Sequence, residues 1–123
     1  MLNELSQKIF QANKEKGFWD NERNVGEMLM LVTTELAEAM ESHRKGKFCQ
    51  LETFNESYFD NLKDAEFKQA FEKNIKDTFE DEMADALIRI LDMCGGLEID
   101  IEKHVELKLR YNSLRPKLHG KLY

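Results

Sequence analysis

Apolar residues recur every three or four positions over much of this chain, which is the spacing of one face of an α-helix. Residues 2–16 show it first, with Leu2, Leu5 and Ile9 at these steps, and Gly17 follows directly. Glycine commonly ends a helix because it adopts the left-handed conformation at little cost. We therefore expect a helix over residues 2–16 and a loop after it.

A longer helix is expected over roughly residues 25–45. Asn24 stands before it, and asparagine side chains often accept hydrogen bonds from the free backbone N–H groups at a helix start. The stretch HRKGK places basic residues in the last turn, where they interact favourably with the helix dipole, and Gly46 suits the turn that follows. Both ends therefore carry residue types that are typical of helix termini.

The pattern is weaker over residues 47–76. We expect helical stretches near residues 49–57 and 63–74, with a break around Asn61. The segment contains no repeat and no low-complexity stretch. We interpret it as an ordered excursion within one domain.

The third principal helix is expected over residues 78–94. Asp77, with Glu80 three residues later, resembles a capping box, which is a signal for a helix start. Gly95 and Gly96 follow the apolar pattern and are expected to end this helix.

The last helix is expected over about residues 101–113, with Asp100 as its N-cap and Pro116 preventing further extension. The chain holds one proline and six glycines in 123 residues, which is too few for a β-sandwich or barrel with many turns. The sequence predicts a single all-α domain over residues 1–123, with four principal helices and a helical excursion.

The helix over residues 78–94 has a narrow polar arc. Each residue advances an α-helix by about 100°, and on this projection the polar residues lie within about 100° of one another. These residues are Asp81, Glu82, Asp85, Arg89 and Asp92. A solvated stripe is the simplest interpretation, but such a stripe should mix charges, and this one holds four acids and one arginine.

Glu35 is the more unusual acid. On the helix over residues 25–45 it lies away from the polar face and beside Met28, Leu31 and Val32. An ionised carboxylate in apolar surroundings is costly unless a partner pairs with it, and no lysine or arginine lies three or four residues away. A bound cation is therefore the expected partner.

Two carboxylates on each of two helices can converge on one point. Glu35 and Glu38 are three residues apart, and so are Glu82 and Asp85. Hard oxygen ligands of this kind suit Mg²⁺ or Mn²⁺. No histidine accompanies them, which argues against a carboxylate-bridged di-iron bundle. We expect these four residues to form a Mg²⁺ site, with Mn²⁺ as the alternative ion.

The net charge of −6 predicts no general attraction to nucleic acid or to anionic membranes. The basic residues are nevertheless concentrated, because residues 103–121 contain one acid, Glu106, and six basic residues: Lys103, Lys108, Arg110, Arg115, Lys117 and Lys121. A basic C-terminal segment in an otherwise acidic chain suggests that the ligand is a phosphate compound bound together with a metal ion.

Lys108, Asn112 and Arg115 are spaced by four and three residues, on the last helix or its continuation. An ammonium, an amide and a guanidinium group suit phosphate oxygens, although a solvated basic face is the alternative. A polyphosphate bound to metal needs cationic groups for the charge that the metal leaves uncompensated. Beside the expected metal site we therefore favour phosphate binding.

Cys49 and Cys94 are too few for a disulfide framework and have no metal-ligand spacing, so reduced thiols are expected. The start of the chain does not have the pattern of a signal peptide, and no apolar run approaches the roughly 18 residues of a membrane span. These features favour a cytoplasmic protein that does not enter a membrane.

Three motifs, ELAEA, EDEMADALIRILD and KLRYNSLRPKLHGKLY, occur in this order. They resemble the MazG-like nucleotide pyrophosphohydrolases of the all-α NTP pyrophosphatase superfamily, whose pattern is two glutamates three residues apart, a glutamate and an aspartate at the same spacing on the next core helix, and a basic C-terminal run. The resemblance covers about residues 5–46 and 77–123 and implies a MazG-like helical bundle. Residues 47–76 are longer than the compact family pattern, so the substrate does not transfer.

The resemblance implies Mg²⁺-dependent hydrolysis of a nucleoside triphosphate between its α and β phosphates, which releases the monophosphate and pyrophosphate. By position, the metal ligands would be Glu35, Glu38, Glu82 and Asp85. The phosphate-binding residues would be Lys108, Tyr111, Asn112 and Arg115. Glu38 and Lys108 are the catalytic candidates, and Glu38 is our choice for the carboxylate that takes a proton from the attacking water.

Phe18 and Trp19 precede the first metal-binding helix. In similar proteins aromatic residues from this region close over the nucleotide base, and an equal alternative is that Trp19 anchors a core or a dimer. The family resemblance also implies a homo-oligomer, either a dimer or a tetramer.

Two other functions are compatible with these patterns. A non-enzymatic helical interaction module would use the apolar faces for a partner protein and would not depend on magnesium. The same fold could also act as a phosphoribosyl-ATP pyrophosphatase or as an enzyme specific for one pyrimidine deoxynucleotide.

Overall fold

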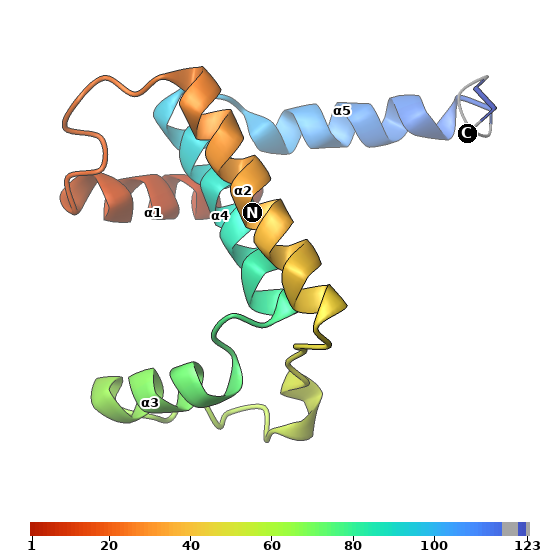
Figure 1. The fold of residues 1–123 in the computed structure, drawn as a ribbon. Coiled ribbons are helices and arrows are strands. Elements are labelled where there is room, and N and C mark those ends of the chain that lie inside the picture. Colours follow the sequence, from red (N-terminus) through yellow and green to blue (C-terminus); the bar gives the residue numbers. More distant parts are fainter. Residues whose placement is uncertain (117–120, 123) are drawn as a thin grey trace. The chain divides into compact units, whose positions relative to one another are not determined.

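The chain is all-helical in the computed structural model, which describes residues 1–116 and 121–122 and has no strand among them. Figure 1 shows the elements, which are α1 (Leu2–Glu15), α2 (Val25–Arg44), the short 3₁₀ helix η1 (Leu51–Thr53), α3 (Asp64–Asn74), α4 (Phe79–Gly96) and α5 (Ile101–Ser113). The predicted all-α class is confirmed. No described helix has both the length and the apolar character needed to cross a membrane.

The helices form two compact units, and the division falls within α4. One unit contains residues 1–22 and the described residues from Leu91 onward, and the other contains residues 23–90. The prediction of one domain over residues 1–123 stays a prediction.

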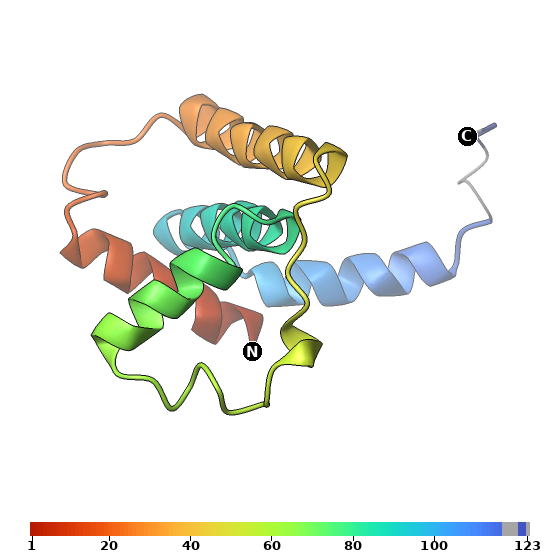
Figure 2. The same ribbon diagram turned by 60° about the horizontal axis from the view of Figure 1, so that its bottom comes forward.

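In the unit of residues 23–90, α2 and the first part of α4 lie side by side (Figures 1 and 2). The buried apolar side chains of this unit are Met28, Val32 and Ala39 from α2 and Ala86 from α4. Ser42 of α2 donates a hydrogen bond of 3.0 Å to the backbone oxygen of Asp77, just before α4. This pairing brings the acidic faces of two helices that are distant in sequence close together.

The predicted ends of α2 and α5 are confirmed. The Asn24 side chain accepts a hydrogen bond of 2.9 Å from the backbone N–H of Glu27. The Asp100 side chain accepts one of 3.0 Å from Lys103, and α5 ends at Ser113, before Pro116.

The prediction of a helix near residues 49–57 is wrong, because only the single turn η1 forms there. The Thr53 hydroxyl donates to the backbone oxygen of Gln50 at 2.7 Å, and the Asn55 side chain accepts from the Ser57 backbone at 3.5 Å. Threonine and asparagine side chains that bond to nearby backbone in this way compete with helix hydrogen bonds. The second predicted stretch, near residues 63–74, is confirmed as α3.

The start of α4 was predicted one residue too early. Asp77 has a φ of 64°, whereas an N-cap residue normally has extended backbone. The cap is Thr78, whose hydroxyl oxygen accepts a hydrogen bond of 3.3 Å from the backbone N–H of Asp81. The Asp81 carboxylate accepts in return from the Asp77 backbone at 3.0 Å.

Gly95 and Gly96 were predicted to end this helix, but they lie inside its last turn. A Cβ on Gly95 would lie 2.7 Å from Cβ of Phe10, and a Cβ on Gly96 would lie 2.3 Å from the ring of Trp19. These distances are too short for real contacts. The two glycines are therefore required by close packing against α1 and the loop after it, and the left-handed residue beyond the helix is Glu98, with a φ of 58°.

Gly96→Ala is expected to lower the free energy of unfolding by about 2 kcal/mol, since the added methyl group overpacks against Trp19. Urea unfolding of both proteins measures the difference. In a Trp19→Phe background the same substitution should cost less, because the smaller ring leaves room for the methyl group. An equal cost in both backgrounds would show that the indole ring is not the cause.

Candidate metal centre

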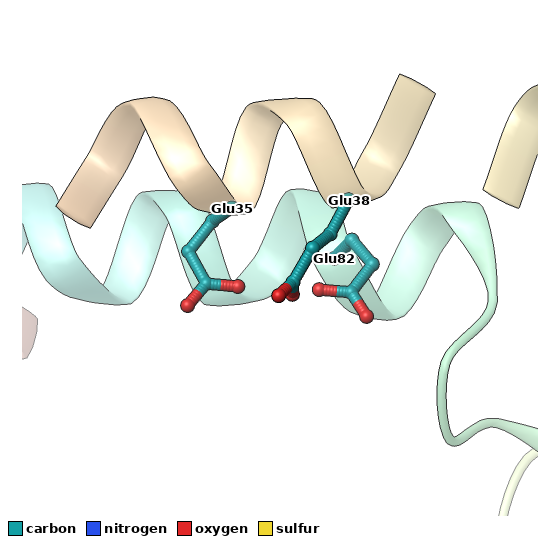
Figure 3. A group of neighbouring side chains, drawn as sticks. All are labelled: Glu35, Glu38 and Glu82. Atoms are coloured by element: carbon teal, nitrogen blue, oxygen red, sulfur yellow. The ribbon is translucent and has the colours of Figure 1, made fainter. Parts of the chain in front are cut away.

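Three of the four predicted metal ligands lie together. Glu35 and Glu38 of α2 and Glu82 of α4 each offer one carboxylate oxygen, and these oxygens all lie within 4.8 Å of one another. Figure 3 shows the two α2 side chains extending from the same face of the helix, with the Glu82 carboxylate beside that of Glu38. The spacing of three residues on α2 places both side chains on that face.

The three carboxylates differ in their exposure to solvent. Glu35 is 9% exposed and Glu82 is 5% exposed, whereas Glu38 is exposed. Charged side chains are seldom so deeply buried unless a partner compensates them. The group therefore has two buried members and one that solvent or a ligand can reach.

Glu35 has a basic partner that its own helix could not reveal. The Arg89 side chain of α4 donates from Nε to Glu35 Oε1 at 2.9 Å, and the two residues are 54 positions apart. Glu35 therefore has a partner within the chain, and the expectation that a bound cation also pairs with it stays a prediction. A helical projection compares residues within one helix, so it places Arg89 on the polar arc of α4 without showing which residue faces it.

Glu82 is the acid whose charge is least compensated. Its Oε2 atom is buried and has no hydrogen-bond partner within the part of the chain that the structure describes. Burial is the largest cause of a pKa of Glu82 raised to about 7, and the hydrogen bond and charge of Glu38 and the charge of Asp85 contribute to the same rise. A positive ion beside this oxygen would favour the ionised form of the carboxylate and would therefore lower its pKa.

Asp85 lies close to this group but outside the set of three converging oxygens. Burial raises its pKa, and the charges of Asp81, Glu35 and Glu38 raise it as well. It therefore experiences the same negative potential. One carboxylate oxygen from each of Asp77, Asp81 and Glu82 also lies within 4.8 Å of the others. The helical projection could not predict this group, because Asp77 precedes the helix.

The donor set fits a hard divalent cation. Carboxylate oxygens are the ligands that Mg²⁺ and Mn²⁺ prefer, and a buried oxygen without a partner is an atom that such an ion would satisfy. No histidine belongs to either acidic group among the described residues.

The predicted phosphate-binding residues belong to the other unit, where α5 carries Lys108, Tyr111 and Asn112. Lys108 Nζ lies 5.2 Å from the centre of the Tyr111 ring, and Arg115 Cζ lies 5.3 Å from it. Arg115 follows the end of α5 rather than continuing its face. The structure therefore brings two cations together around one aromatic ring, with the exposed Asn112 next to it in sequence.

Of the two predicted base-binding residues, Phe18 is exposed and Trp19 is packed within its own unit. The Trp19 indole N–H donates to Asp92 Oδ1 at 3.0 Å, and its ring meets the Phe10 ring edge-on at 5.3 Å. These contacts favour the alternative in which Trp19 is a core anchor. Base binding by either residue stays a prediction.

No family model, no curated protein and no solved structure matches this chain. The function is therefore inferred from the residues of the site and from the three sequence motifs.

The raised pKa of Glu82 predicts a pH-dependent stability in the absence of metal. Between its ordinary value of 4.5 and about 7, the folded chain keeps a proton that the unfolded chain has lost. The free energy of unfolding should therefore fall as the pH rises through this window, by on the order of 3 kcal/mol. Urea unfolding in EDTA at several pH values measures the slope. Glu82→Gln should flatten it, and an unchanged slope in that variant would contradict the assignment.

Proposed function

We propose that this chain is a Mg²⁺-dependent nucleoside triphosphate pyrophosphohydrolase, which cleaves a nucleotide between the α and β phosphates into the monophosphate and pyrophosphate. The observation that carries the proposal is the convergence of Glu35, Glu38 and Glu82, with a buried Glu82 oxygen that lacks a partner. The three ordered sequence motifs support the same class of enzyme.

Glu35, Glu38 and Glu82 would hold the metal, with Asp85 as a fourth ligand from the same face of α4. A bound Mg²⁺ supplies positive charge to phosphate oxygens and lowers the pKa of a coordinated water. Arg89 holds one oxygen of Glu35 and so limits how that carboxylate can turn. Among the proposed ligands, Glu35 is therefore held in place before a metal binds.

Glu38 is the best candidate for accepting a proton from the attacking water. Glu35 is paired with Arg89, and Glu82 is buried. Glu38 is exposed and makes no ion pair within the described residues. A general base must be accessible to water and able to take a proton, and among the three only this residue meets both conditions.

Lys108, Asn112 and Arg115 would bind the phosphates. Their charges and amide suit phosphate oxygens, and the Tyr111 ring against which Lys108 and Arg115 lie would orient both cations. Lys108 is the second catalytic candidate, because a cation near the transferred phosphate offsets charge that develops during cleavage.

We also propose that the chain assembles as a homodimer or tetramer. Helices α2 and α4 expose many large apolar side chains, among them Leu29, Met30, Leu36, Met40, Met83 and Leu87. Large exposed apolar patches commonly mark protein interfaces, and these side chains are candidates for one. The same exposed surface is the observation that favours the competing function, a non-enzymatic interaction module.

The identity of the products tests the proposed reaction. We expect chromatography of a panel of canonical and modified NTPs and dNTPs, incubated with the protein and Mg²⁺, to show a nucleoside monophosphate and pyrophosphate in equal amounts. A diphosphate with inorganic phosphate would place the cleavage at the wrong bond. No turnover by the folded protein, with phosphoribosyl-ATP included in the panel, would favour the interaction module.

A further inference from the structure

Residues 51–75 form a pocket whose lining contains none of the proposed metal ligands. Its volume is about 610 Å³, which lies within the usual range for small-molecule sites. The lining residues are Leu51, Glu52, Phe54, Asn55, Glu56, Phe59, Asp60, Phe67, Phe71 and Ile75. All of them belong to the unit of residues 23–90.

Aromatic and aliphatic side chains form the walls of this pocket. Phe67, Phe71 and Ile75 follow one another at steps of four along α3 and its C-cap, so they share one face of the green helix in Figure 1. Further lining residues come from η1 and the turns after it, where the rings of Phe54 and Phe59 are 5.1 Å apart.

The walls are open to solvent. Phe67 is 41% exposed and Leu51 is 53% exposed. Both side chains therefore remain accessible to solvent, although other apolar residues line the same pocket. A concave apolar surface that stays exposed is typical of a binding site.

The charges of the lining have one sign. Glu52, Glu56 and Asp60 are spaced every four residues, and the lining contains no lysine, arginine or histidine. None of the three makes an ion pair within the residues that the structure describes. The face of an aromatic ring also attracts positive charge. The pocket therefore favours a cation and disfavours an anion such as a nucleotide phosphate.

We propose that this pocket binds a small organic polycation of the linear polyamine class. Its ammonium groups would pair with the three carboxylates, while its methylene chain would lie against the phenylalanine rings. The proposal does not depend on the proposed hydrolase function. A lysine-rich peptide carries the same ammonium groups, but the volume of the pocket favours the small molecule.

Calorimetric titration of spermidine into the full chain, with excess Mg²⁺ present to occupy other acidic groups, tests the proposal. We expect saturable binding at one site. Glu56→Gln with Asp60→Asn should weaken it at least about tenfold, through the loss of two charge pairs. The matched control is Glu66→Gln with Glu72→Gln, which removes two acids of α3 that are not in the lining, and it should change the affinity less than about twofold.

Phe67→Leu tests the aromatic wall while keeping an apolar side chain in α3, and circular dichroism verifies that the helices are retained. We expect the affinity for spermidine to fall about threefold to tenfold. Equal weakening by the lining and control pairs, or displacement of spermidine by Mg²⁺, would overturn the proposal. Tighter binding of tetralysine than of spermidine would also overturn it, in favour of a peptide site.

Discussion

Glu38→Gln is expected to lower pyrophosphate release by at least about a thousandfold while leaving the helices intact. The amide has nearly the shape of the carboxylate, so packing is preserved. It has no negative charge to hold a metal and no basic oxygen to accept a proton. Glu38 is also exposed, so its replacement should cost little stability. A steady-state assay of the purified variant, with circular dichroism to verify folding, measures the effect.

Glu41→Gln is the matched control for this substitution. Glu41 lies three residues further along α2, and its carboxylate pairs with the exposed Lys45 at 3.4 Å and Arg44 at 3.9 Å. Exposed pairs of this kind contribute little to stability. The control should keep nearly full activity. Retained turnover in Glu38→Gln would remove the metal assignment.

Asp85→Asn applies the same test to the fourth proposed ligand. Asp85 is near the charges of Glu35 and Glu38, but its carboxylate lies outside the group of three converging oxygens. We expect this substitution also to abolish turnover, because a bound metal would recruit the carboxylate from the same helix face. If Asp85→Asn keeps full activity while Glu38→Gln does not, Asp85 is not a metal ligand and the site has three ligands.

Arg89→Met is expected to have the largest effect on stability, a loss of about 3 kcal/mol in the free energy of unfolding. The substitution removes the 2.9 Å ion pair and leaves the buried carboxylate of Glu35 without its partner. Methionine keeps most of the apolar stem, so the loss reports mainly on the charge. Urea unfolding in EDTA measures it.

Glu35→Gln in the Arg89→Met background provides the control for that prediction. A neutral amide needs less compensation than an ionised carboxylate, so the double variant should recover much of the lost stability. If the double variant is as unstable as Arg89→Met alone, the cost comes from packing rather than from the unpaired charge of Glu35.

The pairing of Glu35 with Arg89 changes which residue supports the metal site best. The sequence indicates an uncompensated acid at Glu35, and the structure provides Arg89 as its partner. The buried oxygen without a partner belongs instead to Glu82. Glu82 and the three carboxylate oxygens that converge beside it therefore support a bound cation more strongly than Glu35 alone does.

Local signals predicted much of the fold. The caps formed by Asn24 and Asp100 act through side chains within three residues of the bonds they make, so they can be read directly from the sequence. The glycine pair at 95 and 96 could not be interpreted in this way. Its position depends on packing against Phe10 and Trp19, which are distant in the sequence.

In the candidate site too, the features set within one helix could be predicted from the sequence, whereas those set by packing between helices could not. The spacing of three residues correctly brings Glu35 and Glu38 to one helix face, and the structure places Glu82 beside them. The arginine partner could not be predicted, because it depends on which turn of α4 packs against which turn of α2. The packing of Trp19 against Phe10 could not be predicted either, because two adjacent aromatic residues suit both a base-binding surface and a core.

Pyrophosphate release by the unmodified protein, in Mg²⁺, in EDTA and after Mg²⁺ is restored, tests the central claim most directly. We predict turnover of at least one nucleoside triphosphate in Mg²⁺, none in EDTA, and recovery when the ion is returned. Turnover that is equal with and without EDTA would contradict a metal centre formed by Glu35, Glu38 and Glu82.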